Sequence, residues 1–498
     1  MGLMSILLAI GLTGLGAQAQ EPLNIGSRLE LLVDDALIDT LSGGARQVLH
    51  HPAPQDVALV CDEPWEGNAT NYVTVFRDGE LYRMYYRGVQ VTYARDSITS
   101  PNPEVTCMAV SADGIHWVKP RLGLFEFAGS RDNNIVWMGN ETTRHASHNF
   151  TPFRDTNPAC PPEARYKALG GLGGEGGGLW VFKSPDGVHW SLLHDKPVIT
   201  EGAFDSQNLA FWDSLRGEYR EYHRSFRDGR DIMTCTSKDF VNWTAPVFLE
   251  YTPGRTSELY TNQITPYHRA PHLFLGFPTR YLDRGWSPST EALPQLEYRQ
   301  LRAAISQREG TAITDGMFMA SRDGLHFRIW PESFIRPGLR TEYSWFYGDN
   351  YQNWGLVETP STIVGAPDEL SIYVTEGTLQ GDKCWLRRYT LRTDGFVSVQ
   401  APLSGGELVT KPLVFSGGKL VLNFSTGAAG RIRVEVQDEA GQPLPGLTLA
   451  DCPEVFGDDL ARVVPFRDPA ALAALAGKPV RLRFELCDAD LYAFRFTD

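Results

Sequence analysis

The stretch "SADGIHW", residues 111–117, is repeated along the chain and decides the fold. It returns as "SPDGVHW" at Ser184, "SKDFVNW" at Ser237 and "SRDGLHF" at Ser321, with a weaker echo, "RTDGF", at Arg392. Asp and Ser bond to nearby backbone N–H groups and Gly accepts a positive φ, so each copy predicts a tight turn. The aromatic residue that ends each full copy belongs to a new strand. We therefore expect a repeated hairpin tip, whose aspartates serve the fold.

The segments between these turns contain the strands of one repeating unit. Intervals of roughly 50 to 85 residues suit four-stranded propeller blades with variable loops. The first unit, for example, offers "NYVTVF", "LYRMYYRG", "TCMAVS" and "HWVKP", which are rich in β-branched and aromatic residues. Five such units, the last ending in "GFVSVQ", predict a five-bladed β-propeller over residues 25–400. Each turn then joins the third strand of a blade to the fourth.

The composition changes after Gln400, where Gly-rich turns separate alternating strands. This pattern predicts a separate β-sandwich over residues 401–498. A short helix is expected at "DPAALAALAG", capped by Asp468. The predicted fold class is therefore all-β, a five-bladed β-propeller followed by a C-terminal β-sandwich.

Charge and the N-terminus restrict the partners and the location of the protein. The formal net charge of -14 argues against nucleic acid, whose phosphates attract basic surfaces. An apolar run from Leu3 to Leu15 precedes Ala17-Gln18-Ala19, which predicts a signal peptide at residues 1–19. No later segment is long and apolar enough to span a membrane. We expect a secreted or periplasmic protein after removal of the signal peptide.

The candidate site lies where the chain enters the first strand of each blade, because these strands line the central channel. All five strands open with asparagine, at Asn71, Asn149, Asn208, Asn262 and Asn353. Carboxylates precede this asparagine in four blades, at Glu66, Asp205, Glu258 and Asp349. The second blade has Arg144, His145 and His148 there. Further candidates for substrate binding are Trp65, Tyr260, Trp354 and Glu358.

A ring of carboxylates beside aromatic residues suits the hydrolysis of glycosidic bonds. One acid protonates the leaving oxygen, while a second carboxylate activates water or attacks the anomeric carbon. Aromatic faces stack on sugars, and Asn, His and Arg bond the hydroxyl groups. We expect Glu258 as general acid and Asp205 as base or nucleophile, with Glu66 and Asp349 in support. The structural alternative is that these carboxylates cap strands or hold a calcium ion on the axis; no other metal and no cofactor is expected.

The chain resembles a known group of proteins. "LLVDDALID", "FDSQNLAFWD", "YTNQITPY", "HLFLGFPTRY" and "NWGLVETP" look like exported bacterial proteins described as glycosyl hydrolase family 32 N-terminal-domain-like. The same architecture is similar to the five-bladed glycoside hydrolases of families 32 and 43. The resemblance implies a propeller with three acids on successive blades. This sequence departs from that family pattern in two ways: blade two has no acid before its inner strand, and the chain has no W-M-N-D-P-N-G stretch.

Three functions remain open from the sequence. The first is a glycoside hydrolase that acts on an extracellular poly- or oligosaccharide. The second is a glycoside phosphorylase like those of family 130, in which Arg144, His145 and His148 cradle phosphate. The third is a carbohydrate-binding propeller without catalysis, which would keep the aromatic residues and tolerate loss of every carboxylate at the channel mouth.

Overall fold

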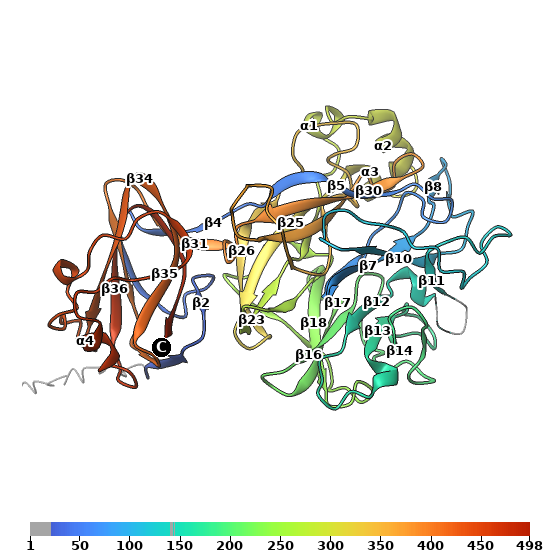
Figure 1. The fold of residues 1–498 in the computed structure, drawn as a ribbon. Coiled ribbons are helices and arrows are strands. Elements are labelled where there is room, and N and C mark those ends of the chain that lie inside the picture. Colours follow the sequence, from blue (N-terminus) through green and yellow to red (C-terminus); the bar gives the residue numbers. More distant parts are fainter. Residues whose placement is uncertain (1–20, 140–142, 144) are drawn as a thin grey trace, which may run out of the picture.

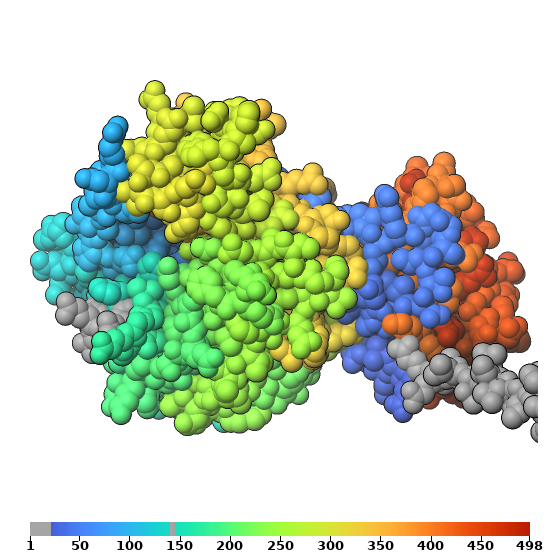
Figure 2. Space-filling view, turned by 180° about the vertical axis from the view of Figure 1, so that it is seen from behind, coloured from blue at the N-terminus to red at the C-terminus, as the bar shows by residue number. Residues whose placement is uncertain are grey.

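The computed structural model describes residues 21–139, 143 and 145–498, and the predicted signal peptide at residues 1–19 lies outside them. It consists of two bodies built almost entirely from strands (Figure 1). Seen from behind, a narrow waist separates the larger body from the smaller one (Figure 2). Among the described residues, no helix has the length and apolar character needed to cross a membrane.

The larger body contains five sheets of mainly antiparallel strands, which are the blades of the predicted propeller. Blade one consists of β6 (Thr74–Asp78), β7 (Leu81–Gly88), β10 (Val105–Ser111) and β11 (Ile135–Met138), with the hairpin β8 (Thr92–Tyr93) and β9 (Ile98–Thr99) between its second and third strands. Blade two consists of β12 (Thr151–Arg154), β13 (Tyr166–Gly170), β14 (Trp180–Ser184) and β15 (Ser191–Leu192). Blade three consists of β16 (Leu209–Asp213), β17 (Glu218–Phe226), β18 (Arg230–Ser237) and β19 (Val247–Phe248).

Blades four and five carry additions to this pattern. Blade four consists of β22 (Thr265–Tyr267), β23 (Ala270–Gly276), β25 (Ala312–Ser321) and β26 (His326–Ile335), to which β20 (Glu250–Thr252), β21 (Glu258–Leu259) and β24 (Thr279–Asp283) are attached. Three helices lie between β24 and β25, namely α1 (Pro288–Glu291), α2 (Leu296–Ala303) and α3 (Gln307–Thr311). Blade five consists of β27 (Tyr351–Gln352), β28 (Val357–Thr359), β29 (Glu369–Glu376), β30 (Cys384–Leu391) and β5 (Ala53–Cys61).

Two outer strands differ from the prediction. In blade one the outer strand is β11, while "HWVKP" forms only the single bridge Val110–Val118. In blade five the outer strand is β5, from the start of the chain, which pairs antiparallel with β30. A strand from the N-terminus thus closes the ring and removes the open edge that blade five would otherwise present.

The repeated turns connect the third strand to the fourth in blades two, three and four, as predicted; the first copy follows the third strand of blade one, and the echo at Arg392 joins β30 to the strand Val397–Ala401 of the smaller body. In the first copy, the Ser111 hydroxyl accepts the N–H groups of Asp113 and Gly114, and Asp113 Oδ1 accepts those of Ile115 and His116. The other three full copies make the same set of bonds. These aspartates therefore stabilise the turns by accepting backbone N–H groups, which is the structural role that the sequence indicates.

The smaller body is the β-sandwich, but it takes strands from both ends of the described chain. Its strands are β1 (Leu23–Gly26), β2 (Glu30–Leu31), β3 (Ile38–Gly43), β4 (Arg46–Leu49), β31 (Val397–Ala401), β32 (Gly406–Thr410), β33 (Leu413–Phe415), β34 (Lys419–Gln437), β35 (Asp458–Val463) and β36 (Arg481–Thr497). The predicted propeller boundary at residue 25 is therefore too early: residues 25–49 and "GFVSVQ", which the sequence places in the propeller, contribute strands to the sandwich instead. Local sequence shows that a segment forms a strand, but pairing depends on contacts distant in the chain. The predicted helix is present as α4 (Pro469–Ala473), capped by Asp468.

Candidate active site

Side chains from all five blades meet at the end of the channel where the inner strands begin. The five residues, one for each blade in order, are Tyr72, His148, Asp205, Tyr260 and Tyr351. Tyr72 lies 5.7 Å from His148 and 6.5 Å from Tyr351 between ring centroids, and Tyr351 lies 5.5 Å from Tyr260. His148 Nε2 lies 2.9 Å from Asp205 Oδ1. We call this ring the channel mouth, and it brings together His148, Asp205 and Tyr260 as the sequence predicts.

Asp205 is the most exposed carboxylate at the mouth, with 66% of its side chain accessible. The other ring nitrogen of His148, Nδ1, lies 3.0 Å from Glu104 Oε1 and 3.1 Å from Arg87 Nη1. Burial and Arg87 lower the pKa of His148, but Glu104 and Asp205 outweigh them and raise it. Burial raises the pKa of Asp205, yet His148, Arg224 and Arg87 together lower it. Asp205 is therefore a carboxylate at neutral pH, and no hydrogen bond from a described residue reaches its Oδ2.

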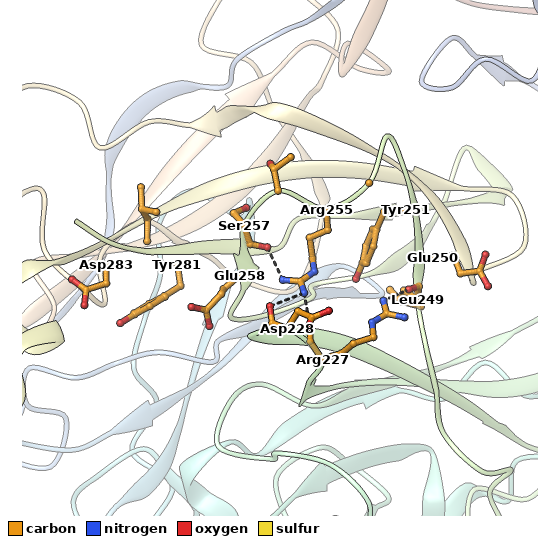
Figure 3. Close-up of a pocket in the computed structure, with 13 residues that line it drawn as sticks. Arg227, Asp228, Leu249, Glu250, Tyr251, Arg255, Ser257, Glu258, Tyr281 and Asp283 are labelled. Carbon is orange, nitrogen blue, oxygen red and sulfur yellow. Dashed lines mark hydrogen bonds between the residues drawn. The ribbon is translucent and has the colours of Figure 1, made fainter. Parts of the chain in front are cut away.

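Glu258 lies beside the mouth on β21, directly across from Tyr281 of β24 (Figure 3). Its Oε2 accepts hydrogen bonds from the Arg230 side chain at 2.7 Å and from the Arg230 N–H at 3.0 Å. Among the described residues, none donates to Oε1. Glu258 lines a cavity of about 730 Å³ together with Tyr281, Asp228 and other residues drawn in Figure 3. One oxygen is thus held by a cation and the other is free toward the cavity.

Five buried tyrosines, which we call the tyrosine cluster, pack together and include the three tyrosines of the mouth: Tyr72, Tyr260, Tyr281, Tyr347 and Tyr351. The hydroxyls of Tyr260 and Tyr347 lie 2.8 Å apart. Burial is the first cause that raises the pKa of Tyr72, Tyr347 and Tyr351 well above the ordinary value. These phenols therefore stay neutral at physiological pH, and no residue of the cluster is more than 9% exposed.

Glu66 does not face the channel, contrary to the prediction. Its side chain is fully buried inside blade one, where it accepts from Lys119 at 2.7 Å, Tyr86 at 2.5 Å and the Glu63 N–H at 2.9 Å. Burial raises the pKa of Glu66 against the opposing effect of Lys119. Trp65 is also part of this blade and donates to Asn134. The preceding loop turns both side chains away from the axis, so both have structural roles.

Asp349 is likewise buried rather than placed at the mouth. Only 1% of the residue is exposed, and its Oδ1 accepts the Thr378 N–H at 2.9 Å. Burial raises its pKa to about 8, so it is protonated at neutral pH. A general acid must reach the leaving oxygen of the substrate. Asp349 has a suitable protonation state but no access, and the predicted supporting role is wrong for this geometry.

The five asparagines that open the inner strands are buried and serve the framework. Their exposed fractions are 6% or less: Asn71, Asn149, Asn208, Asn262 and Asn353. Asn149 shows the role most clearly, because its amide donates to the carbonyl oxygens of Gly171, Phe204 and Ser206 and so joins blade two to blade three. Asn262 donates to Gln207 O in the same way, between blades four and three. Asn149 and Asn262 thus have framework contacts, and the role of the five asparagines as substrate ligands stays a prediction.

Of the remaining predicted residues that the structure describes, only His148 lies at the mouth. Trp354 and Glu358 line a cavity of about 610 Å³ at the opposite end of the channel, where the inner strands of all five blades finish. His145 is exposed and has a positive φ of 56°. Arg144 lies outside the described residues. His148 alone of the predicted basic trio is shown at the mouth, and Glu104 and Asp205 already occupy its N–H groups.

Several residues of the site carry no motif and were missed from the sequence. Arg87 and Arg224 extend from second strands of their blades, Arg230 from a third strand, and Glu104 from the loop before β10. Within the described ranges, no three His, Cys, Asp or Glu side chains are grouped as metal ligands. The axis below the mouth is filled by glutamines, because Gln263 donates to Gln207 at 2.7 Å and to Gln352 O at 2.9 Å.

Comparison with known proteins finds likeness in structure alone. No family model matches the chain, and no curated protein matches it. Similar solved structures include an N-acetylgalactosamine deacetylase from F. plautii, at 14% identity and a TM-score of 0.42, covering 70% of this chain and 96% of that one. Another is an endo-arabinase from Bacteroides thetaiotaomicron, at 9% identity and a TM-score of 0.40, covering 69% of this chain and 97% of that one. A third is the family 32 β-fructofuranosidase of Bombyx mori, at 9% identity and a TM-score of 0.39, covering 90% of this chain and 94% of that one. Glycoside hydrolases of families 32 and 43, which the sequence resembles, are thus represented among these structures.

Proposed function

We propose that the chain is a glycoside hydrolase whose active site is the channel mouth. The observation that carries this proposal is the state of Asp205 and Glu258. Each has one oxygen fixed by a cationic side chain and the other free toward solvent or a cavity. A catalytic carboxylate needs this arrangement, because one oxygen holds the geometry while the other reacts. Glu66 and Asp349, by contrast, are sealed from any substrate.

Asp205 takes the role of base or nucleophile in this proposal. His148, held in turn by Glu104, fixes the position of Asp205 and helps lower its pKa. The ionised form is the one that attacks an anomeric carbon or accepts a proton from water. Glu258 takes the role of proton donor through Oε1. Its partner Arg230 lies 5.3 Å from the ring centroid of Tyr260, which supports a position close to the mouth.

The substrate proposed is an extracellular poly- or oligosaccharide. The tyrosine cluster supports a sugar ligand, because neutral phenols can stack on C–H faces and bond hydroxyl groups. Export is proposed from the apolar run at Leu3–Leu15 and the small residues at Ala17 and Ala19. A phosphorylase finds less support, since the carboxylates Glu104 and Asp205 already bind His148, one of the three residues expected to cradle phosphate.

A panel of oligosaccharides and polysaccharides tests the proposal. Purified protein is incubated with each compound, with and without inorganic phosphate, and new reducing ends are measured. We expect cleavage of at least one compound without phosphate, and the first anomer seen by NMR then distinguishes retention from inversion. Cleavage only with phosphate would identify a phosphorylase instead. Binding of a saccharide without cleavage under either condition would identify a carbohydrate-binding propeller.

A further inference from the structure

Four arginines of the described residues stack on the tyrosine cluster. Arg87 stacks on Tyr72 and pairs with Glu104. We call the other three the arginine group: Arg224 on β17, Arg230 on β18 and Arg308 on α3. The Arg224 guanidinium lies 4.7 Å from the ring centroid of Tyr260. The guanidinium of Arg230 lies 4.2 Å from the ring centroid of Tyr281, and that of Arg308 lies 5.1 Å from the ring centroid of Tyr347. Cations stacked on phenol faces in this way are held in position before a ligand arrives.

The charge of the arginine group is only partly balanced by carboxylates. Arg230 pairs with Glu258 at 2.7 Å, and Arg308 pairs with Glu309 at 3.0 Å. Arg224 is 5% exposed, its Nε has no hydrogen-bond partner, and no carboxylate of the described residues lies within 4.0 Å of its nitrogens. A buried charge is costly unless an opposite charge and hydrogen bonds compensate it. Arg224 is therefore a guanidinium without an ion-pair partner beside the proposed catalytic carboxylate.

The tyrosines cannot supply the missing negative charge. The raised pKa values of Tyr72, Tyr347 and Tyr351 keep these phenols neutral. Asp205 attracts Arg224 across a greater distance, but its Oδ1 is bound by His148. An anionic group of a ligand can fill this place. The planar guanidinium bonds a carboxylate or sulfate through two parallel N–H groups, which a single hydroxyl cannot match.

We infer that the channel mouth is selective for sugars that carry an anionic substituent, a carboxylate or a sulfate, bound by Arg224. This inference rests on the proposed function and specifies the substrate class of that same site. The tyrosine faces contact the sugar ring beside it. Neutral sugars would leave the Arg224 guanidinium without a charged partner, so they bind less well.

Matched pairs of substrates test this inference. One pair is an oligosaccharide ending in a uronic acid and the same compound with that carboxyl reduced to an alcohol. The other is a sulfated oligosaccharide and its desulfated form. We expect the anionic member of at least one pair to have a kcat/KM about tenfold to a hundredfold higher, the scale of a hydrogen bond to a charged group. Equal values within both pairs would overturn the inference.

The variants Arg224→Gln and Arg224→Lys locate the effect. Arg224→Gln should remove the preference for the anionic member, and Arg224→Lys should keep part of it because it keeps the charge without the planar fork. Arg77→Gln is the matched control, because Arg77 lies at the opposite end of the channel. If Arg224→Gln melts like the wild type and still prefers the anionic member, Arg224 is not its partner. If Arg224→Gln fails to fold, a reduced but remaining preference in Arg224→Lys supports the inference, and an unchanged preference overturns it.

Failure of the inference and failure of the proposed function give different results. Cleavage of neutral compounds alone would overturn the inference and leave the hydrolase intact. Binding of the anionic member without cleavage, measured by calorimetry, would support the inference and contradict the hydrolase. An absolute requirement for inorganic phosphate during cleavage would overturn both, because the anion at Arg224 would then be the co-substrate.

Discussion

The Lys119→Met variant tests the structural role of Glu66, which the sequence placed among the catalytic residues. Lys119 Nζ lies 2.7 Å from Glu66 Oε2 and 2.9 Å from Asp62 Oδ1. Asp62 is well exposed, but the side chain of Glu66 is fully buried. The substitution keeps an apolar stem of similar length and removes the charge. It leaves Glu66 inside blade one with only Tyr86 and the Glu63 N–H as donors.

The expected loss follows from the burial of Glu66. Removing one partner of a buried ion pair costs about 3–5 kcal/mol, whereas an exposed pair such as that with Asp62 contributes at most about 1 kcal/mol. Burial already raises the pKa of Glu66 in the folded state, and loss of Lys119 raises it further. A raised carboxyl pKa stabilises the fold below the unfolded value of 4.5, and this contribution is lost as pH rises through the folded pKa. The deficit of Lys119→Met should therefore be larger at pH 7.5 than at pH 4.5.

Urea unfolding followed by tryptophan fluorescence at the two pH values measures this difference. The double variant Glu66→Gln/Lys119→Met, which has no charge to bury, should recover part of the loss at pH 7.5. Glu66→Gln alone should keep turnover per folded molecule. A loss below about 1 kcal/mol in Lys119→Met at pH 7.5 would refute the reasoning. So would a well-folded Glu66→Gln protein that has lost its turnover, since Glu66 would then be catalytic.

Three further predictions concern the mouth, the ring of blades and the N-terminus. His148→Asn should move the acid limb of the kcat/KM profile to higher pH, because the lowered pKa of Asp205 returns toward its ordinary value of 3.8; a pH profile that does not move would contradict this. Asn149→Ala should lower the unfolding free energy by about 1–3 kcal/mol, since the N–H and the carbonyl of Gly171 lose their side-chain partner; Asn208→Ala should cost less, because both of its acceptors, Phe204 O and Ser206 O, keep Asn149 as a donor. Exported protein should begin near Gln20 on N-terminal sequencing, and an intact Met1 would disprove cleavage.

The blades could be predicted because their signals are local. Ser, Asp and Gly at fixed offsets bond to the backbone of their own turn, so residues such as Ser111 and Asp113 identify the tip without knowledge of the rest. The closure of the ring could not be predicted in this way. β5 pairs with β30 across more than three hundred residues of chain, and "GFVSVQ" is as good a strand in the sandwich as in blade five.

The site was predicted in position but not in orientation. Asp205 and Glu66 both precede an inner strand, yet only Asp205 points to the mouth, because Glu66 Oε2 accepts the Glu63 N–H and the loop turns inward. Such a choice depends on partners such as Lys119 that lie far along the chain. The role of Arg224 could not be predicted, because no motif surrounds it and it lies in a strand with several other polar residues.

The turnover of Asp205→Asn on a saccharide that the wild type cleaves tests the central claim most directly. The substitution keeps the size of an exposed side chain and removes the charge that attacks or accepts a proton. Asp195→Asn, at a position 87% exposed and remote from the mouth, is the matched control and should be fully active. We predict that kcat of Asp205→Asn falls at least about a hundredfold with unchanged thermal stability. A folded Asp205→Asn protein that keeps more than about a tenth of the wild-type kcat would contradict the account.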